Sequence, residues 1–522
     1  MTNEGQSSGA AEGGDVVSSA GGRLAPSDRT EPPAGAGSGA SDRTEPSGGD
    51  DRGGAPADGV VPSDGVFYGL AVAAGLVVGT IGTGFHLAAD ALLGAHMAIG
   101  AALPLPLALA ASAAASVAMV LVALALVRNF APEAAGSGVQ EIEGAMIGLR
   151  RLRWRRVLPV KFVAGILSIG SGLVLGREGP TIHIGASVSA AIAELRRFPM
   201  VETRGLYAAG AAAGLAAAFN APLAAVLFVV EETRKQFPYT FRTYLAVILA
   251  SFSSTVVTQE IAGVGPDLRI AAPEQGAGAL VQFLILGVVL GGFGVVFNRT
   301  LLWSLDRFQA AGRRAPYLLP AIVAALIGAM LVAIPDATQG GEALILHLVH
   351  EDRTMLGLLM LVALRFATTM ASYPTGVPGG VFAPILTMAT CVGLLSAAVL
   401  GAVLPGPAAA DALAIAAMGG LFASTVGAPL VGIVLVAELT GSYTVILPTI
   451  ATCAVSCIVA RKLGGRPIYE LLLDRTLRLE GLAPRDPPSD EVPLELGRED
   501  RRRAAAARAG EVAAAAEKGR PR

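Results

Sequence analysis

Charged residues are missing from long stretches of this sequence. Five segments contain no Asp, Glu, Lys or Arg: residues 97–127, 205–230, 275–298, 366–410 and 439–460. A helix needs about 20 consecutive, mainly apolar residues to span a bilayer, and several of these segments are longer than that. The composition agrees, because 53% of the 522 residues are hydrophobic and only 15% are charged. The sequence therefore predicts a polytopic membrane protein built from α-helices.

Cysteine and aromatic residues are also scarce. The three cysteines, Cys391, Cys453 and Cys457, lie in apolar segments, so we interpret them as packing residues and expect no metal site. The apolar region shows no H-E-x-x-H or G-x-S-x-G motif, which argues against an intramembrane enzyme. With 5% aromatic residues the chain offers little to bind an organic solute, and a net charge of −2 gives no sign of nucleic-acid binding. No cofactor is expected.

The predicted domains follow from where polar sequence is placed. Residues 1–64 are rich in small and polar residues and repeat the element S-D-R-T-E-P at 27–32 and 41–46. Such a segment buries too little apolar surface to offset chain entropy, so we expect a disordered tail, without the apolar core of a signal peptide. Residues 65–463 are the predicted transmembrane domain. Residues 464–522 are predicted as a cytoplasmic tail with no regulatory domain.

Arginine-rich clusters flank the apolar segments at residues 150–156, 234–235, 313–314 and 461–462. Basic residues beside membrane helices stay preferentially in the cytoplasm. We therefore place these clusters and both termini on the cytoplasmic side of a cell membrane. Glu232 then lies near that side, and Glu178 lies deeper or farther out. Two carboxylates separated in this way would suit a proton route.

Two parts of the chain resemble each other. Residues 221–231 (A-P-L-A-A-V-L-F-V-V-E) match residues 428–438 (A-P-L-V-G-I-V-L-V-A-E). Upstream of each lies a run of small residues and then a glycine-containing interruption that ends in proline, Pro180 or Pro384. Matched interruptions in two halves point to the central site of a transporter. We expect repeat halves at about 65–265 and 275–463, and hydropathy alone leaves open whether they are inverted.

The interruption at residues 176–180, G-R-E-G-P, places an ionisable side chain within apolar sequence. A carboxylate at membrane depth is costly and persists mainly where it faces a cavity and handles an ion or a proton. Gly176, Gly179 and Pro180 favour a broken helix whose N-terminus, with its free amide donors, begins beside Glu178. This combination is typical of a gate over an anion site. The alternative is an ordinary ion pair between Glu178 and Arg177.

Four segments together resemble the CLC family of chloride channels and chloride/proton antiporters. They are Gly136-Ser137-Gly138-Val139-Gln140-Glu141, residues 176–180, Gly379-Gly380-Val381-Phe382-Ala383-Pro384, and Tyr443. The resemblance covers about 67–461 and extends to Lys161. It implies an all-α membrane fold of two inverted-topology repeats whose broken or re-entrant helices meet at a midplane anion site. It also implies a homodimer with one anion pathway per subunit.

The resemblance assigns roles to individual residues. The helix N-termini after Ser137, Glu178 and Phe382 would direct partial positive charge at chloride, as helix dipoles can. Ser137 and Tyr443 would donate hydroxyl hydrogen bonds to the ion, and Val381 and Phe382 would donate backbone amides. Glu178 would be the external gating glutamate. Glu232 would be the internal proton glutamate, held near Glu143.

Several of these residues have ordinary alternatives. Ser137 could be a helix N-cap, and Tyr443 could be an aromatic at the membrane interface. We interpret Glu141 as a carboxylate that suits a helix N-terminus, and His183 as a hydrogen-bonded core histidine. Lys161 and Arg365 are interpreted as structural charges with buried partners. The family usually has proline at the position of Gln140. Because Ser137 is retained, we expect the preference for chloride to survive, and the selectivity among anions stays open.

The resemblance implies exchange of chloride for protons across a bacterial plasma membrane, with membrane lipid, chloride and protons as partners. A passive chloride channel is the nearest alternative, because conduction alone needs only one gate. An organic-solute transporter and an intramembrane enzyme remain as alternatives from other classes.

Overall fold

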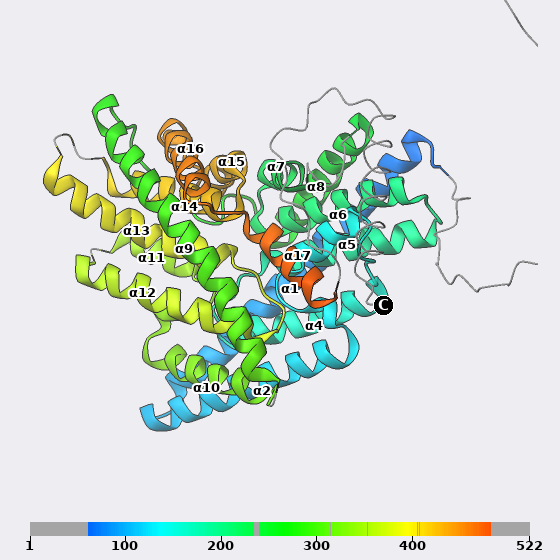
Figure 1. Ribbon diagram of the computed structural model, residues 1–522, viewed down its shortest axis with the longest axis horizontal. Helices are drawn as coiled ribbons and strands as arrows, with labels where there is room; N and C mark the ends of the chain where they lie inside the picture. The colour runs from blue at the N-terminus through cyan, green and yellow to red at the C-terminus, as the bar shows by residue number, and fades with distance from the viewer. Residues whose placement is uncertain are drawn as a thin grey trace, which may run out of the picture. The chain divides into compact units, whose positions relative to one another are not determined.

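The computed structural model describes residues 61–233, 240–313, 315–351, 353–404, 406 and 408–481 (Figure 1). These residues form seventeen α-helices joined by loops and short 3-10 turns, and none of them belongs to a strand. The predicted all-α architecture is confirmed. The basic pair at 234–235, Arg314, residues 1–60 and residues 482–522 lie outside the described residues.

The first sixteen helices fall into two series of eight that match in order. The first series contains α1 (Asp64–Ala102), α2 (Leu105–Phe130), α3 (Val139–Met146), α4 (Trp154–Gly170), α5 (Glu178–Leu195), α6 (Met200–Phe219), α7 (Pro222–Thr233) and α8 (Phe241–Ala262). The second contains α9 (Leu280–Gly312), α10 (Leu318–Ala333), α11 (Glu342–His350), α12 (Met355–Ser372), α13 (Phe382–Val403), α14 (Ala410–Val426), α15 (Pro429–Thr440) and α16 (Ile446–Lys462). A 3-10 turn precedes the third helix of each series, η1 (Pro132–Ala134) and η3 (Pro335–Ala337). The repeat predicted from residues 221–231 and 428–438 is therefore visible in the whole helix order.

Within the described residues, six helical segments are long and apolar enough to cross a membrane. They are Asp64–Ala102, Leu105–Phe130, Phe241–Ala262, Ala277–Gly312, Met355–Thr375 and Phe382–Val403. Other apolar helices are shorter: α15 has 12 residues, and at 1.5 Å per residue it would extend about 18 Å, less than the ~30 Å of a bilayer core. The protein thus combines full spans with short helices that end within the protein.

Close helix pairs recur between the two series. A Cβ atom added at Gly79 of α1 would lie 2.7 Å from the carbonyl oxygen of Ser254 in α8. A Cβ atom added at Gly291 of α9 would lie 2.7 Å from the carbonyl oxygen of Ser456 in α16. Each of these glycines has another glycine four residues earlier in the same helix. Small residues at this spacing let two membrane helices approach closely, so each series holds its outer pair of helices in the same way.

The short helices α7 and α15 cap each other. The Glu438 carboxylate, near the end of α15, accepts hydrogen bonds from the amides of Leu223 (3.1 Å) and Ala224 (2.7 Å) at the start of α7. The Glu231 carboxylate, near the end of α7, accepts one from the amide of Val431 at the start of α15 (3.0 Å). Amides in the first turn of a helix have no partner within the helix, so each glutamate satisfies donors that would otherwise be unpaired.

Helices α5 and α13 begin inside the protein. Their first residues, Glu178 and Phe382, are 0% and 1% exposed. Pro180 and Pro384 are each the third residue of the helix, where a missing N–H costs no hydrogen bond and the fixed φ suits a helix start. The predicted interruption of the membrane helices is therefore confirmed at both positions.

The last helix, α17 (Ile468–Leu479), is an unexpected part of this domain. It packs against α3, α9 and α14. Its buried side chains are mainly apolar, with two acidic ones among them: Ile468, Tyr469, Glu470, Leu472, Leu473, Asp474 and Leu477. The domain boundary predicted after residue 463 thus precedes a helix that packs against the helices before it.

Candidate functional site

The loops before three helices meet at the centre of the domain. Gly176 and Gly380 exchange backbone hydrogen bonds of 2.8 and 2.7 Å, forming an isolated antiparallel bridge. Gly136 forms a parallel bridge with Pro378, through hydrogen bonds with the neighbours of Pro378. These bridges bring the starts of α3, α5 and α13 together, as the sequence motifs predict. First-turn amides from three helices therefore converge on one place.

Two buried cations hold the loops of the two series. Lys161 of α4 donates to the carbonyl oxygens of Ala134 (3.0 Å) and Gly136 (2.7 Å), just before α3. Arg365 of α12 donates to the carbonyl oxygens of residues 336 and 338–340, just before α11. Both side chains are fully buried. Their partners are loop carbonyls, which fits the structural role expected for each.

The Glu178 carboxyl group turns back between the first turns of α5 and α13. A Cβ atom added at Gly176 would overlap Glu178 Oε2 and lie 3.2 Å from the backbone nitrogen of Ala383. A Cβ atom at Gly380 would lie 3.4 Å from the same carboxyl oxygen. The residue is 0% exposed. Glycine at both positions therefore leaves the space that this negatively charged side chain occupies, beside helix N-termini that favour an anion.

Ser137 lies against the same helix start. A Cβ atom added at Gly179 would overlap Ser137 Oγ, and one at Gly138 would overlap the ring of His183. Gly138 also has a left-handed backbone, with φ +91°, which favours glycine. Ser137 Oγ is fully buried and accepts or donates no hydrogen bond within the described residues. An unused hydroxyl at this junction is available to an ion.

His183 is buried, as expected for a core histidine, but the expected hydrogen bonds are not there. Neither ring nitrogen has a hydrogen-bond partner among the residues that the structure describes. The ring packs directly against the Gly138 backbone. The observed role of His183 is therefore to fill the space behind the Ser137 loop.

Val381 and Phe382 stand at the start of α13 and are buried, and their role as amide donors to an anion stays a prediction. The Phe382 ring packs against the rings of Phe422 (5.0 Å between centroids), Phe228 (5.5 Å) and Phe219 (6.1 Å). This aromatic cluster fixes the first turn of α13. It also keeps the neighbourhood of the helix start apolar, which strengthens any electrostatic attraction there.

Tyr443 is predicted to be an ion ligand, but the structure does not bury its side chain. Tyr443 follows α15 and is 65% exposed, away from the buried junction. Tyr469 of α17 is instead the tyrosine at this junction: it is 0% exposed, its ring lies 6.0 Å from that of Phe382, and its hydroxyl, like that of Ser137, has no hydrogen-bond partner among the described residues. The sequence signal was the period of apolar residues from 468 to 477, which predicts one buried helix face. The polar residues between them led to the interpretation of this segment as a tail.

Two more buried carboxyl groups meet between α3 and α7. Glu143 is 0% exposed and Glu232 is 9% exposed. The side chain of Glu232 interacts with that of Glu143, and Glu470 of α17 lies close by. Two buried carboxyl groups in contact cannot both be ionised at low cost, so contact favours a shared proton. Both side chains are buried, on α3 and α7, and their pairing as a proton station stays a prediction.

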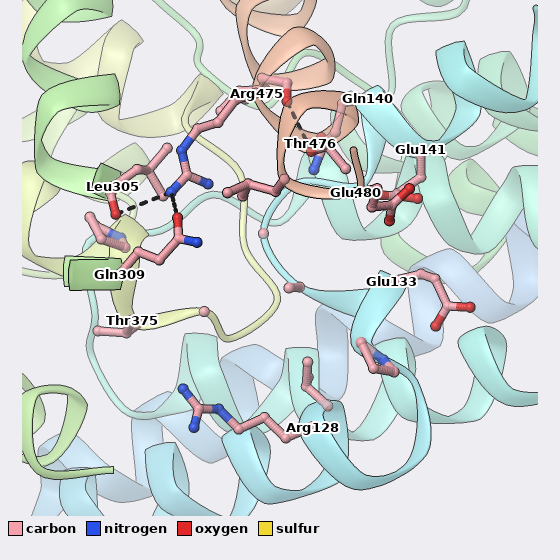
Figure 2. A pocket seen from close by; sticks show the side chains of 18 of the residues that line it. Arg128, Glu133, Gln140, Glu141, Leu305, Gln309, Thr375, Arg475, Thr476 and Glu480 are labelled. Carbon is pink, nitrogen blue, oxygen red and sulfur yellow. Dashed lines mark hydrogen bonds between the residues drawn. The ribbon is translucent and has the colours of Figure 1, made fainter. Parts of the chain in front are cut away.

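A cavity of about 1020 Å³ opens beside the Ser137 loop, and we call it the basic vestibule (Figure 2). The charged residues that line it are Arg128, Arg150, Arg151, Arg153, Arg156, Arg313 and Arg475, with Glu133, Glu141 and Glu480. Figure 2 shows Arg128, Glu133, Glu141 and Arg475 around the opening. The excess of arginine attracts anions toward the junction.

The residues next to Ser137 face this vestibule. Gln140, which stands where the family usually has proline, lines the cavity and is 8% exposed. Its Oε1 atom has no hydrogen-bond partner among the described residues. Glu141 lies in the first turn of α3, as expected, and also forms an ion pair with Arg150 (2.7 Å). Arg150 reaches Glu480, just after α17, at 2.9 Å. This bridge ties the helix that carries Tyr469 to the wall of the vestibule.

A second cavity, of about 440 Å³, lies at the start of α5, and we call it the Arg177 cavity. Arg177 pairs with Asp90 of α1 (3.1 Å) and with Glu342 of α11 (2.7 Å). Asp267 and His86 also line this cavity. The ordinary alternative for Glu178, an ion pair with Arg177, is not what the structure shows, because Arg177 is engaged by other carboxylates.

No group of three His, Cys, Asp or Glu side chains within the described ranges is arranged to hold a metal ion. Cys391 and Cys453 are buried, and Cys457 is half-buried with its thiol directed at the Ala423 carbonyl oxygen (3.2 Å). These thiols pack within helices, in line with the interpretation from sequence.

Comparison with known proteins gives a consistent result. Residues 119–461 match the family model for voltage gated chloride channels. The H(+)/Cl(-) exchange transporter ClcA of Vibrio parahaemolyticus is 44% identical over 375 residues, which cover 70% of this chain and 80% of that protein. ClcA of Citrobacter koseri is 42% identical over 359 residues, covering 67% of this chain and 76% of that protein.

Solved structures agree. A slow cyanobacterial Cl-/H+ antiporter superposes with a TM-score of 0.76 at 34% identity, over 81% of this chain and 100% of that one. A eukaryotic CLC transporter superposes with a TM-score of 0.67 at 23% identity, over 78% of this chain and 73% of that one, and it supports the fold alone.

Proposed function

The chain belongs to the family of voltage gated chloride channels, the CLC family, and we propose that it exchanges chloride for protons across a membrane. The observation that carries the proposal is the position of the Glu178 carboxyl group. It occupies the junction where the first turns of α5 and α13 favour an anion. The Glu178 side chain fills the anion site and can be neutralised by a proton. It therefore couples chloride and proton movement at one site.

The anion site is formed mainly by dipoles. The amides at the starts of α5 and α13, including those of Val381 and Phe382, supply partial positive charge. The hydroxyl groups of Ser137 and Tyr469 supply two further donors. A full cation beside the ion would bind it too tightly for release, whereas dipoles allow chloride to enter and leave.

The exchange cycle follows from competition. Ionised Glu178 occupies the site and excludes chloride. Protonation removes its charge, the side chain leaves the site, and chloride takes its place. The Glu178 carboxylate and chloride need the same hydrogen-bond donors. Chloride can therefore bind only when Glu178 is protonated, so chloride movement depends on proton movement. This is the difference from a passive channel, in which a gate opens without carrying a proton.

A second station on the proton route is the Glu143–Glu232 pair. The pair lies between α3 and α7, on helices separate from the start of α5. Its contact favours a shared proton, which lets Glu232 accept and release protons at a buried position. A passive channel would need only Glu178, so this second buried carboxyl pair favours exchange over conduction.

The orientation proposed here puts the basic vestibule in the cytoplasm. Arg150, Arg153 and Arg156 line it, and arginine beside membrane helices stays preferentially inside. The Arg177 cavity then faces the outer solution, and both termini are cytoplasmic in a bacterial plasma membrane.

We also place a second copy of the chain against α7 and α15. Both helices are too short to span a bilayer, and each exposes a leucine, Leu223 (64%) or Leu430 (57%). A second copy would keep these helices and their polar ends out of lipid. Light scattering of the detergent-solubilised protein tests this homodimer, and a monomer at micromolar concentration would contradict it.

The exchange function is tested in liposomes that contain the purified protein and a chloride gradient. An exchanger moves protons against their own gradient while chloride runs down its gradient. A channel moves chloride alone, and a transporter of organic solutes moves neither. Proton movement that is absent while chloride still flows would favour the channel.

A further inference from the structure

Glu342 connects the gate to the Arg177 cavity. It is the first residue of α11, directly after Gly341, whose φ of +99° lets the chain turn into the helix. Glu342 Oε2 lies 2.7 Å from Arg177 Nη2, and Arg177 Nη1 lies 3.1 Å from Asp90 Oδ2. The side chain of Glu342 is 28% exposed, whereas Glu178 is 0% exposed. Glu342 is therefore a carboxyl group with access to water next to a gate that has none.

The turn before Glu342 packs on the structures that hold the Glu178 carboxyl group. A Cβ atom added at Gly340 would lie 3.3 Å from the Leu175 carbonyl oxygen and 3.4 Å from Cβ of Ala383. The Glu178 carboxyl group lies beside Gly176, which follows Leu175 in the chain, and beside the backbone amide of Ala383. Glu342 also pairs at 2.7 Å with Arg177, the residue directly before Glu178. The two carboxyl groups thus approach each other from α5 and α11.

A hydrogen bond between these two side chains has a simple chemical requirement. Neither carboxyl oxygen of Glu178 has a hydrogen-bond donor among the described residues. A carboxylate cannot donate, so Glu178 and Glu342 can form a hydrogen bond only when one of them carries a proton. Two carboxylates that close together repel each other, which favours a single shared proton.

We propose that Glu342 is a proton partner of the gate, which shares a proton with Glu178 and passes protons between Glu178 and the Arg177 cavity. In the inward step, the O–H bond of Glu342 breaks and an O–H bond forms on Glu178. Glu342 is left ionised and paired with Arg177, and it takes its next proton from water in the cavity. This inference rests on the proposed exchange function and adds an outer residue to its proton route.

The charge of Glu342 also sets how readily Glu178 is protonated. The groups that face the pair are His86 and Asp90 of α1, Arg177, Asp267 of the loop after α8, Arg365 of α12 and Tyr469 of α17. Ionised Glu342 disfavours a second negative charge on Glu178 and offsets the charge of Arg177. Its removal leaves Arg177 to favour the ionised gate, so protonation of Glu178 then requires more acid.

The test compares Glu342→Gln with the wild type in liposomes held at equal pH on both sides. Chloride-driven proton uptake and chloride flux are measured from pH 4 to pH 8. We expect the pH of half-maximal flux to fall by about one unit, the effect of one neighbouring charge. Glu351→Gln is the matched control, because Glu351 follows the far end of the same helix and pairs with Arg353. The Glu351→Gln variant should keep the wild-type pH of half-maximal flux, which we call the midpoint.

A Glu232→Gln background isolates the step at Glu178. Chloride flux in that background depends on protonation of Glu178 alone, so the shift caused by Glu342→Gln should persist there at the same size. A lower flux at every pH with the wild-type midpoint would mean that Glu342 is only structural, and it would overturn the inference. If the wild type itself moves no protons, the exchange function fails before Glu342 is tested.

A second variant covers the case in which Glu342→Gln does not fold. Glu342→Cys removes the charge, and a methanethiosulfonate reagent that carries a sulfonate restores it. We expect the midpoint to fall in Glu342→Cys and to return toward the wild-type value after modification. A sulfonate stays ionised and cannot relay a proton, so proton uptake should stay slower than in the wild type. An unchanged midpoint before and after modification would also overturn the inference.

Discussion

Gly176 and Gly380 exchange two backbone hydrogen bonds, of 2.8 and 2.7 Å, at equivalent positions of the two helix series. Each lies two residues before the first residue of a helix, α5 or α13. Reciprocal bonds between equivalent residues are what a two-fold axis between the halves produces. The axis therefore passes through the place where the Glu178 carboxyl group lies. The anion site belongs to the junction of the halves, and neither half could form it alone.

Other pairs follow the same relationship. Glu231, near the end of α7, caps the start of α15, and Glu438, near the end of α15, caps the start of α7. Lys161 and Arg365 each hold the loop before the third helix of their series. Because the two halves fix each other through these pairs, the helix starts keep their positions without a cation at the ion site itself.

Tyr469 is predicted to bind chloride. Tyr469→Phe removes one hydroxyl donor and leaves the packing against Phe382 in place. A hydrogen bond to a charged partner contributes about 1.5–3 kcal/mol, so we expect chloride binding to weaken about tenfold or more in calorimetry. Tyr443→Phe is the control, because that side chain is 65% exposed, and its isotherm should match the wild type. A larger loss in Tyr443→Phe than in Tyr469→Phe would reverse this assignment.

Glu232→Gln is predicted to separate the two ions. The variant cannot exchange a proton at the inner station, whereas the anion site at Glu178 is untouched. Chloride flux should remain within a few-fold of the wild type while proton uptake falls to background. Glu143→Gln keeps one titratable carboxyl group in the pair, so it should slow proton uptake without abolishing it. Unchanged proton pumping in Glu232→Gln would remove this residue from the route.

The reciprocal caps are predicted to stabilise the fold. Glu438→Gln replaces a carboxylate that accepts bonds from two amides at the start of α7 by a neutral amide. The loss of charge-assisted bonds at a helix N-terminus should lower the free energy of unfolding by about 1–2 kcal/mol. Thermal unfolding of the solubilised protein measures this against Glu260→Gln at an exposed position of α8. Equal midpoints in the two variants would show that the cap contributes nothing.

Gly176→Ala is predicted to loosen coupling. Its Cβ atom would overlap Glu178 Oε2, so the carboxyl group must leave the anion site more often. Chloride flux should rise relative to proton flux, which lowers the number of protons moved per chloride. Gly84→Ala is the control, because a Cβ atom there meets no neighbour within 4 Å. A proton-to-chloride ratio equal to that of the wild type would contradict the position given to Glu178.

Much of the architecture could be predicted from local sequence. The glycines and prolines around Glu178 and Phe382 mark the helix starts because only such residues combine a close approach with a missing donor. The match of residues 221–231 to 428–438 indicated two halves. The inversion of the halves came from the family resemblance and not from hydropathy, because short helices such as α15 make the number of membrane crossings ambiguous in a hydropathy pattern.

The features of the candidate site that the sequence did not predict depend on tertiary contacts. Tyr469 lies in a helix with one apolar face and one charged face, so its polar residues concealed a buried side chain. Tyr443 stands in an apolar segment, which made it look buried although its loop is exposed. Glu342 follows two glycines and no pattern in its own segment points to Glu178. Only the fold brings α11 to the start of α5.

The most direct test of the account measures chloride-driven proton movement by Glu178→Gln in liposomes. Glutamine mimics the protonated gate and cannot release a proton. The account predicts that chloride still flows and that no protons move against their gradient, whereas the wild type moves both. Continued proton pumping by Glu178→Gln would contradict the central claim that one carboxyl group serves as both the gate and the proton carrier.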